Sequence, residues 1–243
     1  MVFRQSLVSY ARSITTALGF GLLLVFVLPF FWLPNTIVSS GTVLIDYGFL
    51  KQFPLYSLAL LALTLVFLFA YSVLVSLMVF AVRTDLSPVK LHLYLKEKID
   101  KFALKYFVFL AAFTVIAAVI TALLVDAGVP VPVVNAVLLL LSASFMFLPQ
   151  AIVIDEESLV SSILAGWEFI TKSPSSFLIV FAFGAFSLLL LQVMEFTLDY
   201  FLNLGSFLSL LIALVFLVPY IEALKTYIYM NRFGIMQSYH KMT

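Results

Sequence analysis

The chain has 243 residues, of which 64% are hydrophobic and only 10% are charged, with a net charge of +1. A soluble domain is usually about half apolar and a quarter charged, so this composition predicts a polytopic membrane protein without a soluble domain of ordinary size. The absence of cysteine excludes disulfides, thiolate metal sites and a cysteine nucleophile. The few basic residues flank apolar runs, which is typical of membrane topology and argues against nucleic-acid binding.

Six apolar runs have about the 20 residues that a helix needs to cross a bilayer. They predict an all-α integral membrane protein, a single domain over 1–243, with spans at roughly 14–33, 55–82, 106–125, 136–154, 177–196 and 207–224. The first run has no small-residue cleavage site, so we expect a retained span and not a removed signal peptide. A polar loop is expected between the first two spans. Pro149 is expected to kink the last turns of the fourth.

The stretch between the second and third spans, 83–105, is the most charged part of the chain. Ser87-Pro88 is typical of a helix start, and helical spacing of apolar residues predicts an interfacial helix over about 88–105. Its basic flank consists of Lys90, Lys96, Lys98, Lys101 and Lys105. These lysines are candidates for contacting anionic lipid head groups, each contributing on the order of 1 kcal/mol near a charged membrane. The alternative is ordinary topogenic charge.

A second interfacial helix is predicted over about 156–172, with Asp155 as its cap and acids in its first turn. The face that should anchor it at the membrane has helical spacing and consists of Leu159, Ile163, Trp167 and Ile170. An aspartate at Ile163 is therefore expected to destabilise the protein, whereas one at Ser162 should be nearly silent. The alternative is a helix that only connects two spans.

The basic residues divide unevenly between the two predicted faces of the membrane. Twelve of the 13 Lys and Arg residues fall on one face, and Lys51 alone falls on the other. The positive-inside rule then predicts a multi-pass protein of the cell membrane with both termini, and both interfacial helices, on the cytoplasmic side.

Catalytic signatures are scarce in this chain. Neither of the two histidines, His92 and His240, belongs to a metal-spaced pair. No phosphate-binding glycine loop and no nucleophile elbow occurs in the sequence. We therefore expect neither an enzyme nor a cofactor.

Five polar side chains within or at the ends of spans are candidates for a polar path or groove: Gln150, Gln192, Glu195, Asp199 and Glu222. The three on the fifth span share one helix face, which indicates either a site in a transport path or a helix that has already reached water. For Glu222, an ion pair with Lys225 and a position facing a groove beside Pro149 and Gln150 are both open. If the pair is exposed, its loss should cost at most about 1 kcal/mol.

The second half of the chain carries a series of short motifs between about Leu138 and Tyr229. They are Phe147-Leu-Pro149, Ile152-Val-Ile154-Asp155-Glu156, the amphipathic helix through Trp167, Lys172-Ser-Pro174, Val218-Pro219-Tyr220 and Thr226-Tyr227-Ile228-Tyr229. In this order they resemble the membrane domain attached to some bacterial glycerophosphodiester phosphodiesterases and its stand-alone bacterial and archaeal relatives. The resemblance implies a membrane architecture, and it implies no phosphodiesterase activity because the soluble catalytic domain is not part of it.

The leading hypothesis is a non-enzymatic six-span membrane protein that engages lipid or a membrane partner through its cytoplasmic-face helices. The alternative is a transporter or channel, oligomeric or not, with a path lined by the fifth and sixth spans. An enzyme acting on lipid head groups is a third, weaker hypothesis. The expected partners are membrane lipids, with a second copy of the chain or another membrane protein as alternatives, and no nucleic acid.

Overall fold

The computed structural model describes residues 2–31, 36–39, 42–45, 54–86, 92–202 and 204–231. Within these residues six helical segments are long and apolar enough to cross a membrane: Ile14–Phe31, Leu58–Leu86, Lys98–Asp126, Pro132–Asp155, Pro174–Phe201 and Gly205–Asn231. The predicted six-span, α-helical membrane protein is therefore confirmed.

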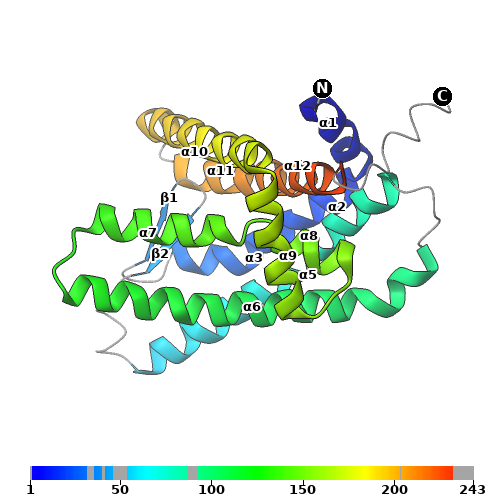
Figure 1. Ribbon diagram of the computed structural model, residues 1–243. Helices are drawn as coiled ribbons and strands as arrows, with labels where there is room; N and C mark the ends of the chain where they lie inside the picture. Colours follow the sequence, from blue (N-terminus) through cyan, green and yellow to red (C-terminus); the bar gives the residue numbers. More distant parts are fainter. Residues whose placement is uncertain are drawn as a thin grey trace.

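The spans run back and forth along one direction, as Figure 1 shows for the long helices α5 (Pro54–Leu86), α6 (His92–Asp126) and α10 (Pro174–Leu202). Helix α1 (Val2–Arg12) and the last turns of α12 (Val218–Asn231) lie at the same end of this bundle. Helix α9 (Leu159–Lys172) crosses the direction of the spans at that end, which we call the α9 end. The α6–α7 and α10–α11 connections lie at the opposite end.

A two-stranded antiparallel hairpin interrupts the otherwise helical fold. Strand β1 (Thr36–Ser39) pairs with β2 (Thr42–Ile45), with Thr36 opposite Ile45 and Ser39 opposite Thr42. The sequence predicts a polar loop between the first two spans, and the hairpin corrects this prediction. Both strands consist mainly of β-branched residues, which favour this conformation.

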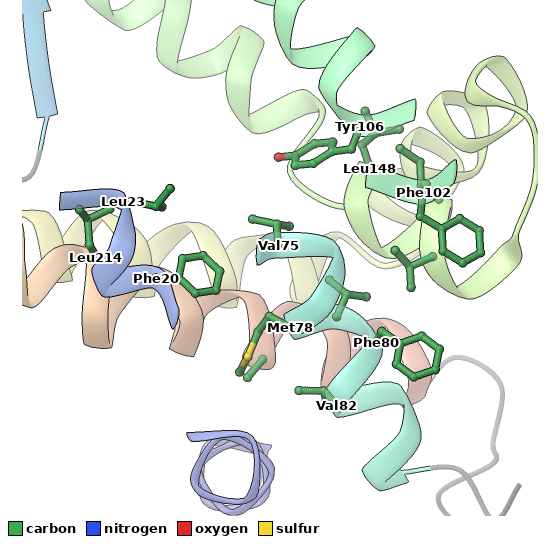
Figure 2. Packing of buried hydrophobic residues seen from close by; sticks show 14 of the residues in the cluster. Phe20, Leu23, Val75, Met78, Phe80, Val82, Phe102, Tyr106, Leu148 and Leu214 are labelled. Atoms are coloured by element: carbon green, nitrogen blue, oxygen red, sulfur yellow. The ribbon is translucent and has the colours of Figure 1, made fainter. Parts of the chain in front are cut away.

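The main hydrophobic core lies where the first span meets α5 and the α9 end of the fourth span. The first span is built from α2 (Ile14–Gly19), η1 (Phe20–Leu22), α3 (Leu23–Val27) and η2 (Leu28–Phe31). Its Phe20 and Leu23 pack with Val75 and Met78 of α5, as Figure 2 shows. No residue in the most apolar stretch of α6 is fully buried, so this span lies at the periphery.

Helix α6 is one continuous helix where the sequence predicts two separate elements. The predicted interfacial helix over 88–105 and the predicted span over 106–125 form one continuous helix from His92 to Asp126. Neither proline nor glycine occurs between these two residues, so nothing in the backbone chemistry ends the helix at the membrane boundary.

The fourth span breaks before Pro149. Helix α7 (Val131–Ser144) ends in a turn, and α8 (Leu148–Gln150) and the π-helix η3 (Ala151–Asp155) follow. Proline has no N–H to offer the Phe145 carbonyl four residues earlier, and that carbonyl accepts from the Leu148 N–H at 3.0 Å. The predicted distortion is therefore present as a break in the helix.

The sixth span also contains a π-helix beside a proline. It consists of α11 (Gly205–Ile212), η4 (Ala213–Leu217) and α12. Pro219 cannot donate to the Val215 carbonyl, and the Tyr10 hydroxyl of α1 donates to that oxygen at 3.3 Å. Partial burial raises the pKa of Tyr10, which keeps this phenol protonated as a donor.

Helix α9 differs from its prediction in both its cap and its orientation. The cap is Ser158, whose Oγ accepts from the Ser161 N–H at 3.2 Å, so the predicted Asp155 cap is wrong. The face packed on the protein is centred on Ser162, Gly166 and Phe169.

The four predicted anchors of α9 do not share one environment. Leu159 and Ile163 pack against the main core, and Ile170 packs against a second cluster around Phe147 and Phe169. Only Trp167 is exposed. Periodicity gives a helical stripe but cannot say whether protein or lipid covers it, since both are apolar.

Ser162 provides a test of this packing. Its side chain is buried and its Oγ has no hydrogen-bond partner. Ser162→Ala removes an unsatisfied hydroxyl and should raise stability by about 1 kcal/mol. Ser162→Asp buries an unpaired carboxylate and should lower it by about 3 kcal/mol or more, contrary to the tolerance expected from the sequence.

Thermal unfolding of the detergent-solubilised variants measures both effects. An unchanged midpoint for Ser162→Asp would mean that α9 does not pack through this face.

Candidate functional site

The half of α12 at the α9 end is enclosed by protein on every side. All nine residues from Glu222 to Met230 are buried. Helices α1, α5, α8 and α10 contact α12, and Phe169 of α9 packs against its Tyr229. Helices at the edge of a membrane bundle expose one face to lipid, so a stretch buried all round marks α12 as the central element.

Two ionisable side chains lie within this enclosed stretch. Lys225 Nζ and Glu222 Oε1 are 2.6 Å apart, and their side chains are only 8% and 5% exposed. The other carboxylate oxygen of Glu222 accepts from Gln150 Nε2 of α8 at 2.9 Å. Thr226 Oγ1 donates to the Glu222 backbone carbonyl at 2.7 Å. We call Gln150, Glu222, Lys225 and Thr226 the polar cluster.

One acceptor atom of the polar cluster has no hydrogen-bond partner. Gln150 is completely buried, and its Oε1 has no hydrogen-bond partner. The amide cannot turn this oxygen toward Glu222, because a carboxylate accepts hydrogen bonds and needs the Nε2 side. The ionised pair therefore fixes the Gln150 side chain.

The structure shows the ion pair of Glu222 with Lys225, whereas the groove beside Pro149 and Gln150 stays a prediction. The carboxylate pairs with Lys225 in its own helix and also contacts Gln150, the residue after Pro149. The pair is not exposed, so the expectation of at most about 1 kcal/mol does not apply to it.

A second polar constellation holds the turn between η3 and α9. Glu156 contacts Arg83 of α5 at 3.0 Å and Lys98 of α6 at 2.8 Å. Arg83 also donates to the Val153 carbonyl at 2.6 Å, and Lys105 donates to the Glu157 carbonyl at 2.6 Å. Glu156 has a positive φ of 58°, an unusual conformation for a non-glycine residue that the surrounding contacts must stabilise.

Asp155 has a different partner from the one predicted. It accepts from the Tyr229 hydroxyl at 2.5 Å, which ties the same turn to α12. Together these contacts join α5, α6 and α12 at the α9 end.

The five lysines predicted to contact lipid head groups divide accordingly. Lys98 and Lys105 are engaged within the protein, and Lys101 is exposed. Lys90 and the side chain of Lys96 lie outside what the structure describes.

The polar residues of the fifth span lie at the opposite end of the bundle from the polar cluster. Glu195 is buried and accepts from Ser206 at 3.0 Å and Ser209 at 2.9 Å. Asp199 accepts from the Gly205 N–H at 2.6 Å, while Gln192 is exposed. Two of these side chains therefore bind α10 to α11, and the five path candidates do not converge on one place.

The buried serines in and just after α1, and the contacts of Arg83, are not among the predicted site residues. Ser6, Ser9 and Ser13 recur at helical spacing and are all buried, and this spacing was a readable signal. Arg83 was counted only toward the charge balance, because no local pattern links it to residues 153 and 156.

Comparison with known proteins adds no relative. No protein-family model matches the chain, and no curated protein or solved structure matches it either.

A double-mutant cycle on Glu222 and Lys225 tests the polar cluster. Glu222→Gln and Lys225→Met should each lower stability by about 3–5 kcal/mol, because each leaves the partner charge buried and unpaired. The double variant should lose clearly less than the sum of the two.

The matched control is the ion pair of Glu168 and Lys172 on α9, whose side chains are 52% and 73% exposed. Its cycle should give a coupling of only about 0.3–0.5 kcal/mol. Equal coupling energies for the two pairs, measured by thermal unfolding in detergent, would contradict the burial of Glu222.

Proposed function

We propose that this chain is a non-enzymatic membrane protein that engages membrane lipid through α9. The observation that supports the proposal is the outward face of this helix. Val160, Leu164 and Trp167 recur at helical spacing and are each more than half exposed. The opposite face packs on the protein core, so the helix is apolar toward both sides.

The surroundings of this face suit the boundary between head groups and acyl chains. Glu168 and Lys172 form an exposed ion pair next to Trp167, close to where α9 ends. Tryptophan rings favour this depth because they combine an apolar body with a polar N–H. A helix lying in the interface buries its apolar face about 5–10 Å into this boundary.

The same proposal includes the orientation of the chain. The α9 end carries five basic residues: Arg83, Lys98 and Lys105, which contact residues 153–157 before α9, Lys101, which lies between the two lysines on α6, and Lys172, the last residue of α9. The positive-inside rule places such an end on the cytoplasmic side of the cell membrane, with both termini there. The likeness of the second half to the glycerophosphodiester phosphodiesterase membrane domain is part of the proposal at the level of architecture.

A transporter or channel is the second candidate, and the polar cluster favours it. Ionisable residues inside spans often mark ion or proton pathways. A path lined by the fifth and sixth spans would use Glu222 at the α9 end. Ion flux of the wild type in reconstituted vesicles separates the two candidates, because only a transporter or channel should conduct.

Tryptophan fluorescence tests the lipid contact of α9. With Trp32→Phe, Trp167 is the sole tryptophan of the chain. In vesicles whose lipids carry bromine at different acyl depths, its emission should be blue-shifted and quenched most by the shallowest bromine. Acrylamide, a water-soluble quencher, should have little effect. Strong acrylamide quenching without bromolipid quenching would refute the lipid contact.

Accessibility of single cysteines tests the orientation. The chain has no cysteine, so each introduced thiol is unique. Ala127→Cys and Leu204→Cys at the opposite end should react with a membrane-impermeant reagent on intact cells, whereas Lys101→Cys and Glu157→Cys should react only after lysis. The reverse pattern would invert the protein in the membrane.

A further inference from the structure

We infer that α1 is a second lipid-binding element, and that it selects anionic lipid. The helix lies at the α9 end. It ends at Arg12, and only Ser13 separates it from the first span, Ile14–Phe31. The inference rests on the proposed function in one respect, namely that this end of the bundle meets the bilayer interface. It adds a different helix and a specific lipid charge.

The inward face of α1 is polar and its polar groups are satisfied. Ser6 and Ser9 are 0% and 2% exposed, and Ser13, which directly follows the helix, is 6% exposed. Ser6 Oγ donates to the Phe3 carbonyl at 3.0 Å and lies 3.3 Å from the Tyr220 hydroxyl of α12. Ser9 Oγ donates to Asp85 of α5 at 3.0 Å.

Two further side chains fasten the same face. The Tyr227 hydroxyl of α12 donates to Gln5, and the Tyr10 hydroxyl donates to the Val215 carbonyl at 3.3 Å. The Tyr10 ring also packs edge-on against the Tyr220 ring, with centroids 5.8 Å apart. These contacts fix the rotation of α1, so the direction in which its remaining side chains point is determined.

The outward face of α1 is apolar. Phe3, Leu7 and Val8 are 45%, 56% and 46% exposed. A helix on the surface of a water-soluble protein shows the reverse arrangement, with apolar residues inward and polar residues outward. The medium that suits the outward face of α1 is therefore the apolar side of a membrane interface.

The charge of α1 identifies the head group. Residues 2–12 contain no aspartate or glutamate and two arginines, Arg4 and Arg12. Arg4 is exposed beside the apolar residues. Arg12 contacts Asp85 at 2.9 Å, and its side chain is 65% exposed. A guanidinium has five N–H donors in a fork that matches phosphate oxygens.

Helix α9 lacks this charge preference. On its exposed face, Lys172 is paired with Glu168, so the two charges cancel. The structure therefore separates two properties between the helices: α9 is an apolar anchor, and α1 combines an apolar face with a net positive charge. A partner that meets both features of α1 is a bilayer surface containing anionic phospholipid.

The first part of the test measures the depth of α1. A nitroxide spin label on Leu7→Cys reports its collisions with oxygen, which concentrates in lipid, and with a water-soluble nickel chelate. In nanodiscs of zwitterionic and anionic phospholipid, the label should favour oxygen. A label that collides mainly with nickel would overturn the inference.

The same measurement on Leu164→Cys reports α9 separately. If Leu164 lies in lipid and Leu7 in water, the inference about α1 fails while the proposed function stands. If Leu7 lies in lipid and Leu164 in water, α1 is supported and the proposed role of α9 fails.

The second part measures charge selectivity. The relative association of a spin-labelled anionic phospholipid over its zwitterionic counterpart is compared for the wild type, Arg4→Gln and the control Lys172→Gln. Arg4→Gln should lower the selectivity up to about fivefold, since one basic residue near a charged surface contributes about 1 kcal/mol. The control should change it little.

Arg4 is exposed, so the substitution should leave the thermal midpoint unchanged, which separates lost binding from lost folding. Equal selectivity in the wild type and Arg4→Gln would overturn the assignment of the anionic lipid to α1.

Discussion

The enclosure of α12 between Glu222 and Met230 is the constraint on which the rest of the structure depends. Within a bilayer no water is available to satisfy a buried donor, acceptor or charge, so a charge without a partner in the protein is costly. Lys225 donates to one carboxylate oxygen of Glu222, and Gln150 donates to the other. The other elements are arranged around this requirement: α8 brings Gln150, and α1 covers the side of α12 that carries Tyr220 and Tyr227.

Near Pro149 and near Pro219, a backbone carbonyl accepts a hydrogen bond from a side chain of another helix. Pro219 has no N–H to donate to the Val215 carbonyl four residues earlier. The Val153 carbonyl lies in the π-helix η3, which follows Pro149. A side chain from another helix fills each gap, Tyr10 in the first case and Arg83 in the second. The π-helices η4 and η3 are thus points of attachment between elements distant in the chain.

Six spans could be predicted because hydropathy over about 20 residues is imposed by the bilayer and not by tertiary contacts. The finer predictions failed where two apolar environments compete. Ile163 and Trp167 belong to one helical stripe, yet one packs on the core and the other is exposed. The position of Ser158 as cap depended on Glu156 taking a left-handed conformation, which follows from Arg83 and Lys98 and is invisible in the local sequence.

The polar cluster was predictable in part. The spacing of three residues between Glu222 and Lys225 indicates an ion pair, but only the fold shows that it is buried and that Gln150 joins it. Glu195 looked like a site because an acid in a span is costly. Ser206 and Ser209, which satisfy it, lie beyond a turn whose tightness depends on Gly205, where a Cβ would collide with the Glu195 carbonyl and Asp199.

The contact between α1 and α12 has a consequence for how the chain is assembled. Gln5 meets Tyr227 across 222 positions of sequence, and Ser6 meets Tyr220 across 214. A ribosome therefore delivers α1 to the membrane long before Gln5 and Ser6 can meet α12, although Ser9 can already contact Asp85 once α5 has been inserted. The contacts between α1 and α12 therefore form late in biosynthesis. A chain stalled before α12 would lack the contacts of Gln5 with Tyr227 and of Ser6 with Tyr220.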